Sequence, residues 1–205
     1  MKGPAKYAVG DYIFQFITIT IGVLIALFIN GLVEWNNNRE LVEQARSTIR
    51  REIADNKKDI DATLAGIEED VRKFESAIKF ATDMLTAKKT TINELNFHIN
   101  LADLSSAGWR TAERTGALSH MDYAEVQRYS KLYDFQDLIV EQQRALVGQL
   151  GDVTAILNPD FDPDNPNPKD LEIFRERLLT LRAGLTVHAQ MAKRLTESYS
   201  ETLKQ

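Results

Sequence analysis

Residues 12–33 read YIFQFITITIGVLIALFINGLV and contain no charged side chain. As a helix, these 22 residues span about 33 Å, the thickness of the hydrocarbon core of a bilayer. The run is too long for the apolar part of a cleaved signal peptide, and no small-residue cleavage site follows it. A buried core helix is the other alternative. We expect a transmembrane helix over residues 12–34, and a single crossing because no second run of this length follows.

The charges on either side of this run predict its orientation. The tail, residues 1–11, carries Lys2 and Lys6, whereas several arginines follow the run. A plain count of basic residues favours the opposite orientation, but long domains cross membranes largely regardless of their charge. We therefore expect the short basic tail in the cytoplasm. Residues 35–205 would then form a helical domain in the periplasm of a Gram-negative cell.

One face of the apolar run differs from the rest. Its members follow steps of three or four residues, so a helix places them on one side. This polar stripe consists of Gln15, Thr18, Gly22, Ala26 and Asn30. Small residues four apart let helices approach closely, and amides form hydrogen bonds between membrane helices. The stripe predicts contact with another membrane helix or a second copy of the chain; the alternative is an anchor that tolerates a few polar side chains.

The composition excludes several classes of protein. With 205 residues, of which 43% are hydrophobic, the chain can build a folded core. A net charge of -5, with acids and bases mixed along the chain, disfavours a nucleic-acid binder. The absence of cysteine excludes disulfides, thiolate metal sites and a cysteine nucleophile. Ten glycines and five prolines disfavour a turn-rich all-β fold.

The remaining sequence has the spacing of long helices. No proline interrupts residues 12–88, so the anchor should continue into one long stalk helix. Its apolar seam alternates steps of four and three: Ile60, Leu64, Ile67, Val71, Phe74, Ile78, Ala81 and Leu85. Charged residues beside the seam, such as Arg50, Glu52 and Lys57, are expected on its solvated faces.

Capping signals and turns divide the rest of the chain. Further helices are predicted over residues 91–104, 109–115, 122–157 and 169–203, with Gly116 ending the second of them. Tyr123, Val126, Tyr133, Leu146, Leu150 and Val153 are the expected core residues of the helix at 122–157. Residues 158–168, NPDFDPDNPNP, contain four of the five prolines and predict an irregular loop.

The last predicted helix has the most regular seam. Its apolar positions are Leu171, Phe174, Leu178, Leu181, Leu185, His188, Ala192, Leu195 and Tyr199. Helices with an apolar seam on one side pack together as an antiparallel bundle. The predicted fold class is therefore all-α: one N-terminal transmembrane helix that continues into a bundle of about three long and two short helices.

Short motifs lie in a fixed order along residues 10–140. INGLVEWN at 29–36 and IRREI at 49–53 are followed by WRTA at 109–112, GAL at 116–118 and then Tyr129, Leu132 and Tyr133. In this order they resemble a family of uncharacterised bacterial single-pass inner-membrane proteins. The resemblance implies a protein of the bacterial inner membrane with one N-terminal span. A charged helix and a tyrosine-rich helix follow the span. It implies no activity, and it does not cover the proline-rich loop or the last helix.

Residues suited to catalysis or metal binding are few. His98 lies one helical turn after Glu94, which suits an acid-base pair or one edge of a metal site, but metal sites need three or four ligands and no HExxH or ExxH motif occurs. We expect His98 to be exposed or to cap a helix, His120 to be exposed, and His188 to be a hydrogen-bonded histidine in the core or at the edge of the bundle. The phosphate-binding and hydrolase motifs GxxxxGK[ST], GxGxxG and GxSxG are also missing. The sequence predicts a protein that is not an enzyme and has no metal or cofactor.

The proline-rich loop contains one further pattern. Asp160, Asp162 and Asp164 alternate as in the first half of a calcium-binding loop. An EF-hand needs Gly at the sixth and Glu at the twelfth position, where this chain has Asn165 and Leu171. A solvated loop, or one that docks on a partner, is therefore favoured over weak calcium binding.

The densest aromatic group outside the apolar run contains Trp109, Tyr123, Tyr129, Tyr133 and Phe135. Packing in the core is the main expectation for these side chains. The alternative is a protein-binding surface, since aromatic residues and arginines concentrate binding energy at interfaces. The residues proposed for that surface are Trp109, Arg110, Arg114, Tyr129 and Tyr133.

Together, these features predict a non-enzymatic structural or accessory subunit that stabilises a larger membrane protein complex through its span and its bundle. The expected partners are the lipid bilayer, other transmembrane proteins of a respiratory, photosynthetic, transport or secretion complex, or a second copy of the chain; nucleic acid is not expected. The alternative is a membrane-anchored sensor or signalling module. Because the tail before Tyr12 is too short for an output domain, such a sensor would act through a membrane partner.

Overall fold

A computed structural model describes residues 5–86, 97–157 and 166–204. Its elements are α1 (Ala5–Leu85), α2 (Ala107–Arg114), the 3-10 helix η1 (Ala117–His120), α3 (Tyr123–Thr154) and α4 (Pro168–Lys204). Over these residues the secondary structure is helical and contains no strand, which confirms the all-α prediction. The predicted cap at residues 91–94 and most of the proline-rich loop lie outside the described residues.

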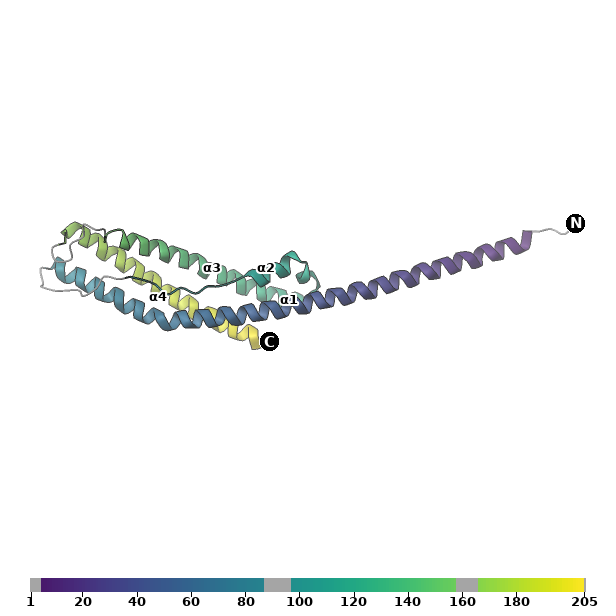
Figure 1. The fold of residues 1–205 in the computed structure, drawn as a ribbon, viewed down its shortest axis with the longest axis horizontal. Coiled ribbons are helices and arrows are strands. Elements are labelled where there is room, and N and C mark those ends of the chain that lie inside the picture. Colours follow the sequence, from purple (N-terminus) through teal and green to yellow (C-terminus); the bar gives the residue numbers. More distant parts are fainter. Residues whose placement is uncertain (1–4, 87–96, 158–165, 205) are drawn as a thin grey trace.

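Helix α1 is one uninterrupted rod of 81 residues, about 120 Å long at 1.5 Å per residue. Its first part projects alone from the rest of the molecule, and its second part is packed in a bundle (Figure 1). We call residues 10–37 the projecting segment, because every side chain in it is exposed. The prediction of a single helix through the anchor and the stalk is confirmed.

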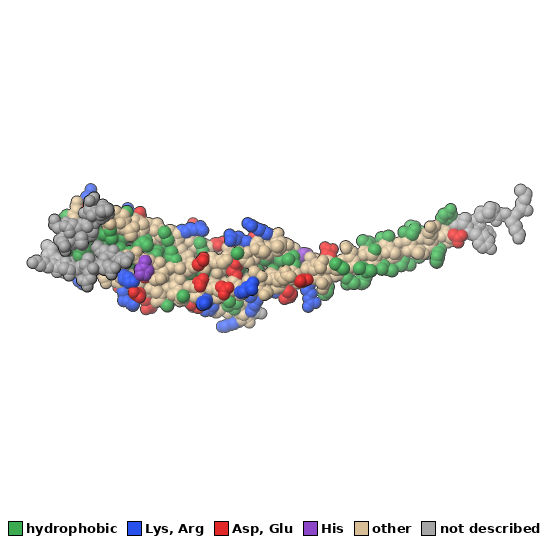
Figure 2. All heavy atoms as spheres, in the orientation of Figure 1, with side chains coloured by type: hydrophobic (Ala, Val, Ile, Leu, Met, Phe, Trp, Pro, Cys, Tyr) green, Lys and Arg blue, Asp and Glu red, His purple; other side chains and the backbone are tan. Residues whose placement is uncertain are grey.

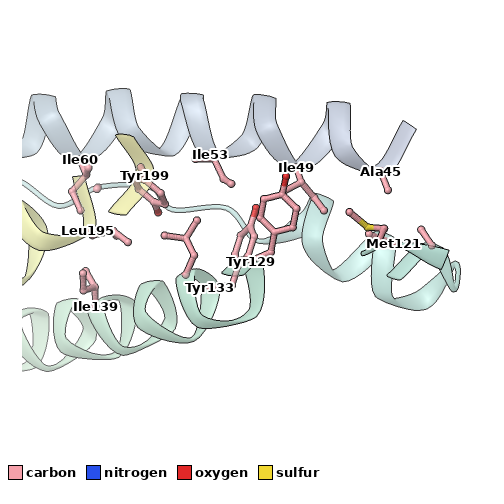
Figure 3. Close-up of a cluster of buried hydrophobic side chains, with 14 of the residues drawn as sticks. Ala45, Ile49, Ile53, Ile60, Met121, Tyr129, Tyr133, Ile139, Leu195 and Tyr199 are labelled. Carbon is pink, nitrogen blue, oxygen red and sulfur yellow. The ribbon is translucent and has the colours of Figure 1, made fainter. Parts of the chain in front are cut away.

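The bundle consists of the second part of α1 together with α3 and α4 (Figure 1). Helix α4 packs against both of the others and runs antiparallel to them. Two buried clusters fill the space between the helices. In the cluster nearer the projecting segment, side chains from all three helices converge, among them Ile53, Tyr133 and Tyr199 (Figure 3).

The predicted seam of α4 is confirmed in full. All nine of its residues are buried, from Leu171 to Tyr199. Pro168 is the first residue of the helix, where its fixed φ and missing N–H are tolerated. A fully buried Leu or Phe side chain contributes about 1.5–3 kcal/mol to stability, so this single helix supplies a large share of the core.

The seam of α1 is only half as predicted. Ile60, Ile67, Phe74 and Ala81 are buried as expected, but Leu64, Val71 and Ile78 are half-buried and Leu85 is exposed. Their places are taken by polar residues seven apart: Asn56, Thr63 and Asp70. The reason is that Asn56 and Asp70 face a segment of main chain that requires hydrogen-bonding partners.

This segment, residues 97–106, is not helical, although a helix was expected as far as residue 104 and a turn only from Ser105. We call it the strap, because it runs along the bundle and is bonded to side chains of both α1 and α3 (Figure 1). Asn100 donates its backbone N–H and its side-chain amide to Asp70 Oδ2, both at 2.9 Å. With its side-chain amide in the orientation that satisfies both groups, Gln143 accepts from Ala102 N at 2.9 Å and donates to Ala102 O at 3.3 Å. These side chains replace the hydrogen bonds that a helix would have supplied.

The turns before α3 follow the sequence signals. Gly116 has φ 77°, a left-handed conformation that favours glycine, and it ends the short helix α2 as predicted. Asp122 caps α3 by accepting a hydrogen bond from Glu125 N at 3.1 Å. Tyr123 was expected in the core, but it is 75% exposed. Its hydroxyl accepts a hydrogen bond from Gln127 Nε2 at 2.8 Å, one turn later on the exposed face of α3.

Candidate functional site

The projecting segment presents an apolar surface that is flanked by Asp11 and Glu34, whereas most of the charged side chains lie on the bundle (Figure 2). Its large hydrophobic side chains between Tyr12 and Val33 are 49–73% exposed. Among the described helices, α1 alone is long and apolar enough to cross a membrane. Exposed apolar surface of this extent on a soluble protein would be strongly unfavourable, because water-exposed apolar patches are rarely larger than a few hundred Å².

All five residues of the polar stripe lie on this segment with their side chains exposed. Thr18 donates its hydroxyl to the carbonyl of Phe14 at 2.9 Å, which satisfies the hydroxyl within the helix. A Cβ atom added to Gly22 would meet no atom within 4 Å, so the face of the helix is open there. Within the described chain, the amides of Gln15 and Asn30 form no hydrogen bond, which leaves both able to bond with a neighbouring helix.

A cleft of about 380 Å³ lies where α1 enters the bundle. Its lining comes from α1 and from the end of η1: Trp35, Asn38, Arg39, Val42, Glu43, Arg46 and His120. The guanidinium of Arg39 lies 5.7 Å from the centre of the Trp35 ring, a cation–π contact. The expectation that His120 is exposed is confirmed.

Arg46 ties α1 to the start of α3. It donates from Nε to Glu125 Oε1 at 2.9 Å and from Nη2 to Glu125 Oε2 at 2.7 Å, a bidentate pair. Its Nη1 also donates to Glu43 Oε1 at 2.9 Å. The hydrogen bond with Glu125 raises the pKa of Arg46 further above its ordinary value. One turn later, Arg50 donates to the carbonyl of Leu203 at 2.6 Å and so holds the end of α4.

The residues proposed as a partner surface divide between core and surface. Trp109 stacks on Tyr133 with ring centres 5.4 Å apart and also contacts Tyr129. Both tyrosines are buried, so their rings are not available to another protein. Trp109 is half-buried, and Arg110 and Arg114 are exposed on α2.

Glu52 is a key residue that the sequence analysis placed on a solvated face. Its carboxylate accepts hydrogen bonds from Gly108 N at 2.7 Å, Trp109 N at 3.3 Å and the hydroxyl of Tyr133 at 2.6 Å. It therefore caps α2 from a neighbouring helix, and no spacing along the sequence signals such a contact. Burial is the main reason that the pKa of Tyr133 lies well above its ordinary value, with the bond to Glu52 adding to it.

A buried polar network fixes the end of the strap. Asn56 donates to Ser105 O at 2.7 Å and accepts from Ser105 N at 2.9 Å. Gln136 donates to the same carbonyl at 2.9 Å and accepts from the hydroxyl of Tyr199 at 2.7 Å. All three long helices thus contribute to the position of Ser105. The seven-residue spacing of Asn56, Thr63 and Asp70 is the signal that could have revealed the strap, because polar residues at a regular core position need a partner.

The other histidines are also placed as expected. His188 is buried, with Nδ1 3.0 Å from Gln142 Oε1, and burial lowers its pKa. His98 is exposed beside the strap, with Nε2 3.7 Å from the buried Asp70 Oδ1. Over residues 5–86, 97–157 and 166–204, no three His, Asp or Glu residues are grouped closely enough to hold a metal ion.

No family model, curated protein or solved structure with which the chain was compared gave a match. The resemblance to a bacterial inner-membrane family therefore stays a prediction.

Proposed function

We propose that the chain is a single-pass, membrane-anchored accessory subunit that stabilises a larger membrane protein complex. The observation that carries this proposal is the contrast within α1: an exposed segment with an uncharged, apolar run at residues 12–33 continues without a break into a packed bundle. A bilayer covers the first part, and partner proteins use the second part as a rigid support beside the membrane.

The anchor is supported by length, composition and exposure together. Residues 12–33 match the hydrocarbon thickness of a bilayer, and their apolar side chains are available to lipid. Trp35 follows this run, at the depth where amphipathic rings favour the membrane surface. We place the N-terminus in the cytoplasm of a bacterial cell and the bundle in the periplasm, for the charge and translocation reasons given above.

The stripe supports docking to other transmembrane helices. It is open along the whole projecting segment, and its two amides have no partner within the described chain. In hydrocarbon, an amide gains from a hydrogen bond to a second helix, while glycine and alanine allow the backbones to approach. The occupant we propose is a transmembrane helix of the host complex.

The non-enzymatic role is supported by the positions of the groups best suited to chemistry. Glu52 is committed to capping α2, Tyr133 to bonding Glu52, and His188 to Gln142 in the core. Each of these side chains stabilises the bundle. The bundle therefore suits a supporting element better than a catalytic one.

The test is the mass of the particle that contains the chain after gentle solubilisation of native membranes in mild detergent. We expect a particle much larger than the 23.3 kDa chain, with partners at fixed stoichiometry. The variant Gly22→Leu closes the stripe and should release the chain, whereas Thr20→Leu, on another face of the helix, should not. A monomer or small homo-oligomer in the wild type would overturn the proposal and favour the sensor alternative.

A further inference from the structure

We propose that the cleft between α1 and η1 binds the phosphate group of a membrane phospholipid. This inference rests on the proposed membrane span, and it adds a ligand to the same end of the bundle. The cleft is lined by Trp35, Asn38 and Arg39 on α1 and by His120 at the end of η1. Two parts of the chain far apart in sequence therefore form its walls.

The depth of the cleft matches the headgroup layer. The uncharged run ends at Val33, and Arg39 lies six residues later, about 9 Å farther along the helix. The headgroup region occupies the outer 5–8 Å or so on each side of the hydrocarbon core. Trp35, about 3 Å beyond Val33, therefore lies within this layer when residues 12–33 span the core. The backbone of Arg39 lies at its outer edge, and because helical side chains point toward the N-terminus, its long side chain reaches back to the phosphates.

Arg39 is the cation available for a phosphate. Within the described residues it forms no ion pair, and its contact is with the face of Trp35 at 5.7 Å. Stacking on an aromatic ring leaves the guanidinium edge free, and that edge binds phosphate oxygens in a bidentate manner. The indole N–H of Trp35 and the amide of Asn38 are further donors on the same wall.

The acidic residue of the cleft already has an ion-pair partner. Glu43 accepts from Arg46 Nη1 at 2.9 Å, and Arg46 is also paired with Glu125. The lining of the cleft thus holds two arginines and one carboxylate, and the carboxylate is bonded to Arg46 and not to Arg39. The volume of about 380 Å³ is within the range of small-molecule sites and admits a phosphodiester with a small headgroup.

A lipid held in this cleft would connect α1 to η1 at the membrane surface. The bundle would then meet the bilayer at a fixed angle, which an accessory subunit needs in order to present its surface to a partner. A free phosphate ion offers the same oxygens but lacks the acyl chains that keep a lipid beside the span. The lipid has the higher effective concentration and is the ligand we assign.

The experiment uses the full chain in dodecyl maltoside, a detergent without phosphate. The chain has two tryptophans, so Trp109→Phe leaves Trp35 as the fluorescent reporter in the cleft. We expect dihexanoyl-phosphatidylglycerol to change Trp35 emission saturably, and dihexanoylglycerol, which lacks the phosphate, to leave it unchanged. Inorganic phosphate should bind at least tenfold more weakly than the phospholipid. In the converse variant, Trp35→Phe, the distant Trp109 should not respond.

Two substitutions decide whether Arg39 is the ligand. Arg39→Gln should weaken binding about 10- to 100-fold, because a hydrogen bond to a charged group is worth about 1.5–3 kcal/mol. Arg51→Gln removes an exposed arginine of the same helix outside the cleft and should leave affinity unchanged. Unchanged affinity in Arg39→Gln, or equal responses to phospholipid and diacylglycerol, would overturn the proposal. If inorganic phosphate bound as tightly as the phospholipid, the ligand of the cleft would be a soluble anion, and the lipid proposal would be overturned.

These failures are distinguishable from failure of the proposed function. Alkaline washing of native membranes tests the anchor in the wild type without reference to the cleft. A chain that stays in the membrane and in its large particle, but shows no phospholipid response, would overturn the lipid site alone. A chain that washes off would overturn the membrane span and the lipid site together.

Discussion

The two parts of α1 have the same backbone and opposite surroundings. In the projecting segment, residues such as Phe14 and Phe16 are more than 70% exposed, whereas in the bundle Phe74 and Ile60 are at most 1% exposed. The first part is apolar on nearly every face, and the second is apolar along one seam with charges elsewhere. The distribution of apolar residues around the helix therefore suits the first part to an apolar environment and the second part to a bundle with one face in water.

The largest effect is expected from charge in the projecting segment. Leu24→Arg together with Leu27→Arg should prevent membrane insertion, because each central arginine costs about 2.5–3.5 kcal/mol and the pair about 5–7. Ala62→Arg with Ala65→Arg has the same spacing on exposed positions of the bundle and should leave insertion intact. Alkaline extraction of membranes measures the insertion of both double variants. Retention of the first variant at the wild-type level would break the contrast between the two parts.

The second effect concerns the core. Phe74 stacks on Phe97 with ring centres 5.5 Å apart and is almost fully buried. Phe74→Ala should lower the free energy of unfolding by about 3–5 kcal/mol, whereas Phe16→Ala in the projecting segment should leave it nearly unchanged. Urea unfolding of the full chain in detergent, followed by Trp109 fluorescence in a Trp35→Phe background, gives both values. Equal losses would show that the two phenylalanines have similar surroundings.

The third effect sharpens the description of the buried seam. Asn56→Ala leaves both backbone groups of Ser105 without their bonds to α1, which costs about 1–3 kcal/mol. Hydrogen exchange at the amide of Ser105 should accelerate with this loss. Asn36→Ala, an exposed asparagine on the same helix, is the matched control. Protection of Ser105 that is insensitive to Asn56 would mean that the strap is not held by α1.

The smallest effect is a pH dependence confined to the bundle. Burial holds the pKa of His188 below the ordinary value of about 6.5, so the unfolded chain takes up a proton first as pH falls. The contribution of His188 to stability is therefore complete above about pH 6.5 and declines below it, by at most about 1.4 kcal/mol per pH unit. His188→Asn should remove this part of the slope, and His120→Asn, at an exposed site, should keep it. Identical slopes in both variants would contradict a buried neutral His188.

Local signals in the sequence were sufficient for most of the helices. The seam of α4, the cap at Asp122 and the stop at Gly116 depend on residues a few positions apart, so the spacing predicted them correctly. The apolar run at residues 12–33 was equally easy to recognise, since its length and lack of charge are local properties.

The failures lie where long-range contacts decide the conformation. The strap is held by side chains about 30–50 residues away in sequence, such as Asp70 to Asn100 and Asn56 to Ser105, and its own residues also suit a helix. Glu52 and Tyr123 were misplaced for a related reason, because packing decides their positions: Glu52 receives a distant helix terminus, and Tyr123 lies on the exposed face of α3. The residues of the proposed partner surface could likewise be found from composition. Which of them are buried tyrosines and which are surface arginines became clear only from the packing of the helices.

The measurement that tests the membrane anchor most directly is cysteine accessibility along α1 in native membranes. The chain has no cysteine, so single substitutions at Ile17, Leu24, Asn37, Asp55 and Ile60 report their own surroundings. With a membrane-impermeant maleimide applied to both faces of the membrane, we expect labelling at Asn37 and Asp55. Ile17 and Leu24 should be protected by lipid, and Ile60 should be protected until the bundle unfolds. Labelling of Ile17 and Leu24 at the rate of Asp55 would place the projecting segment in water and contradict the anchor.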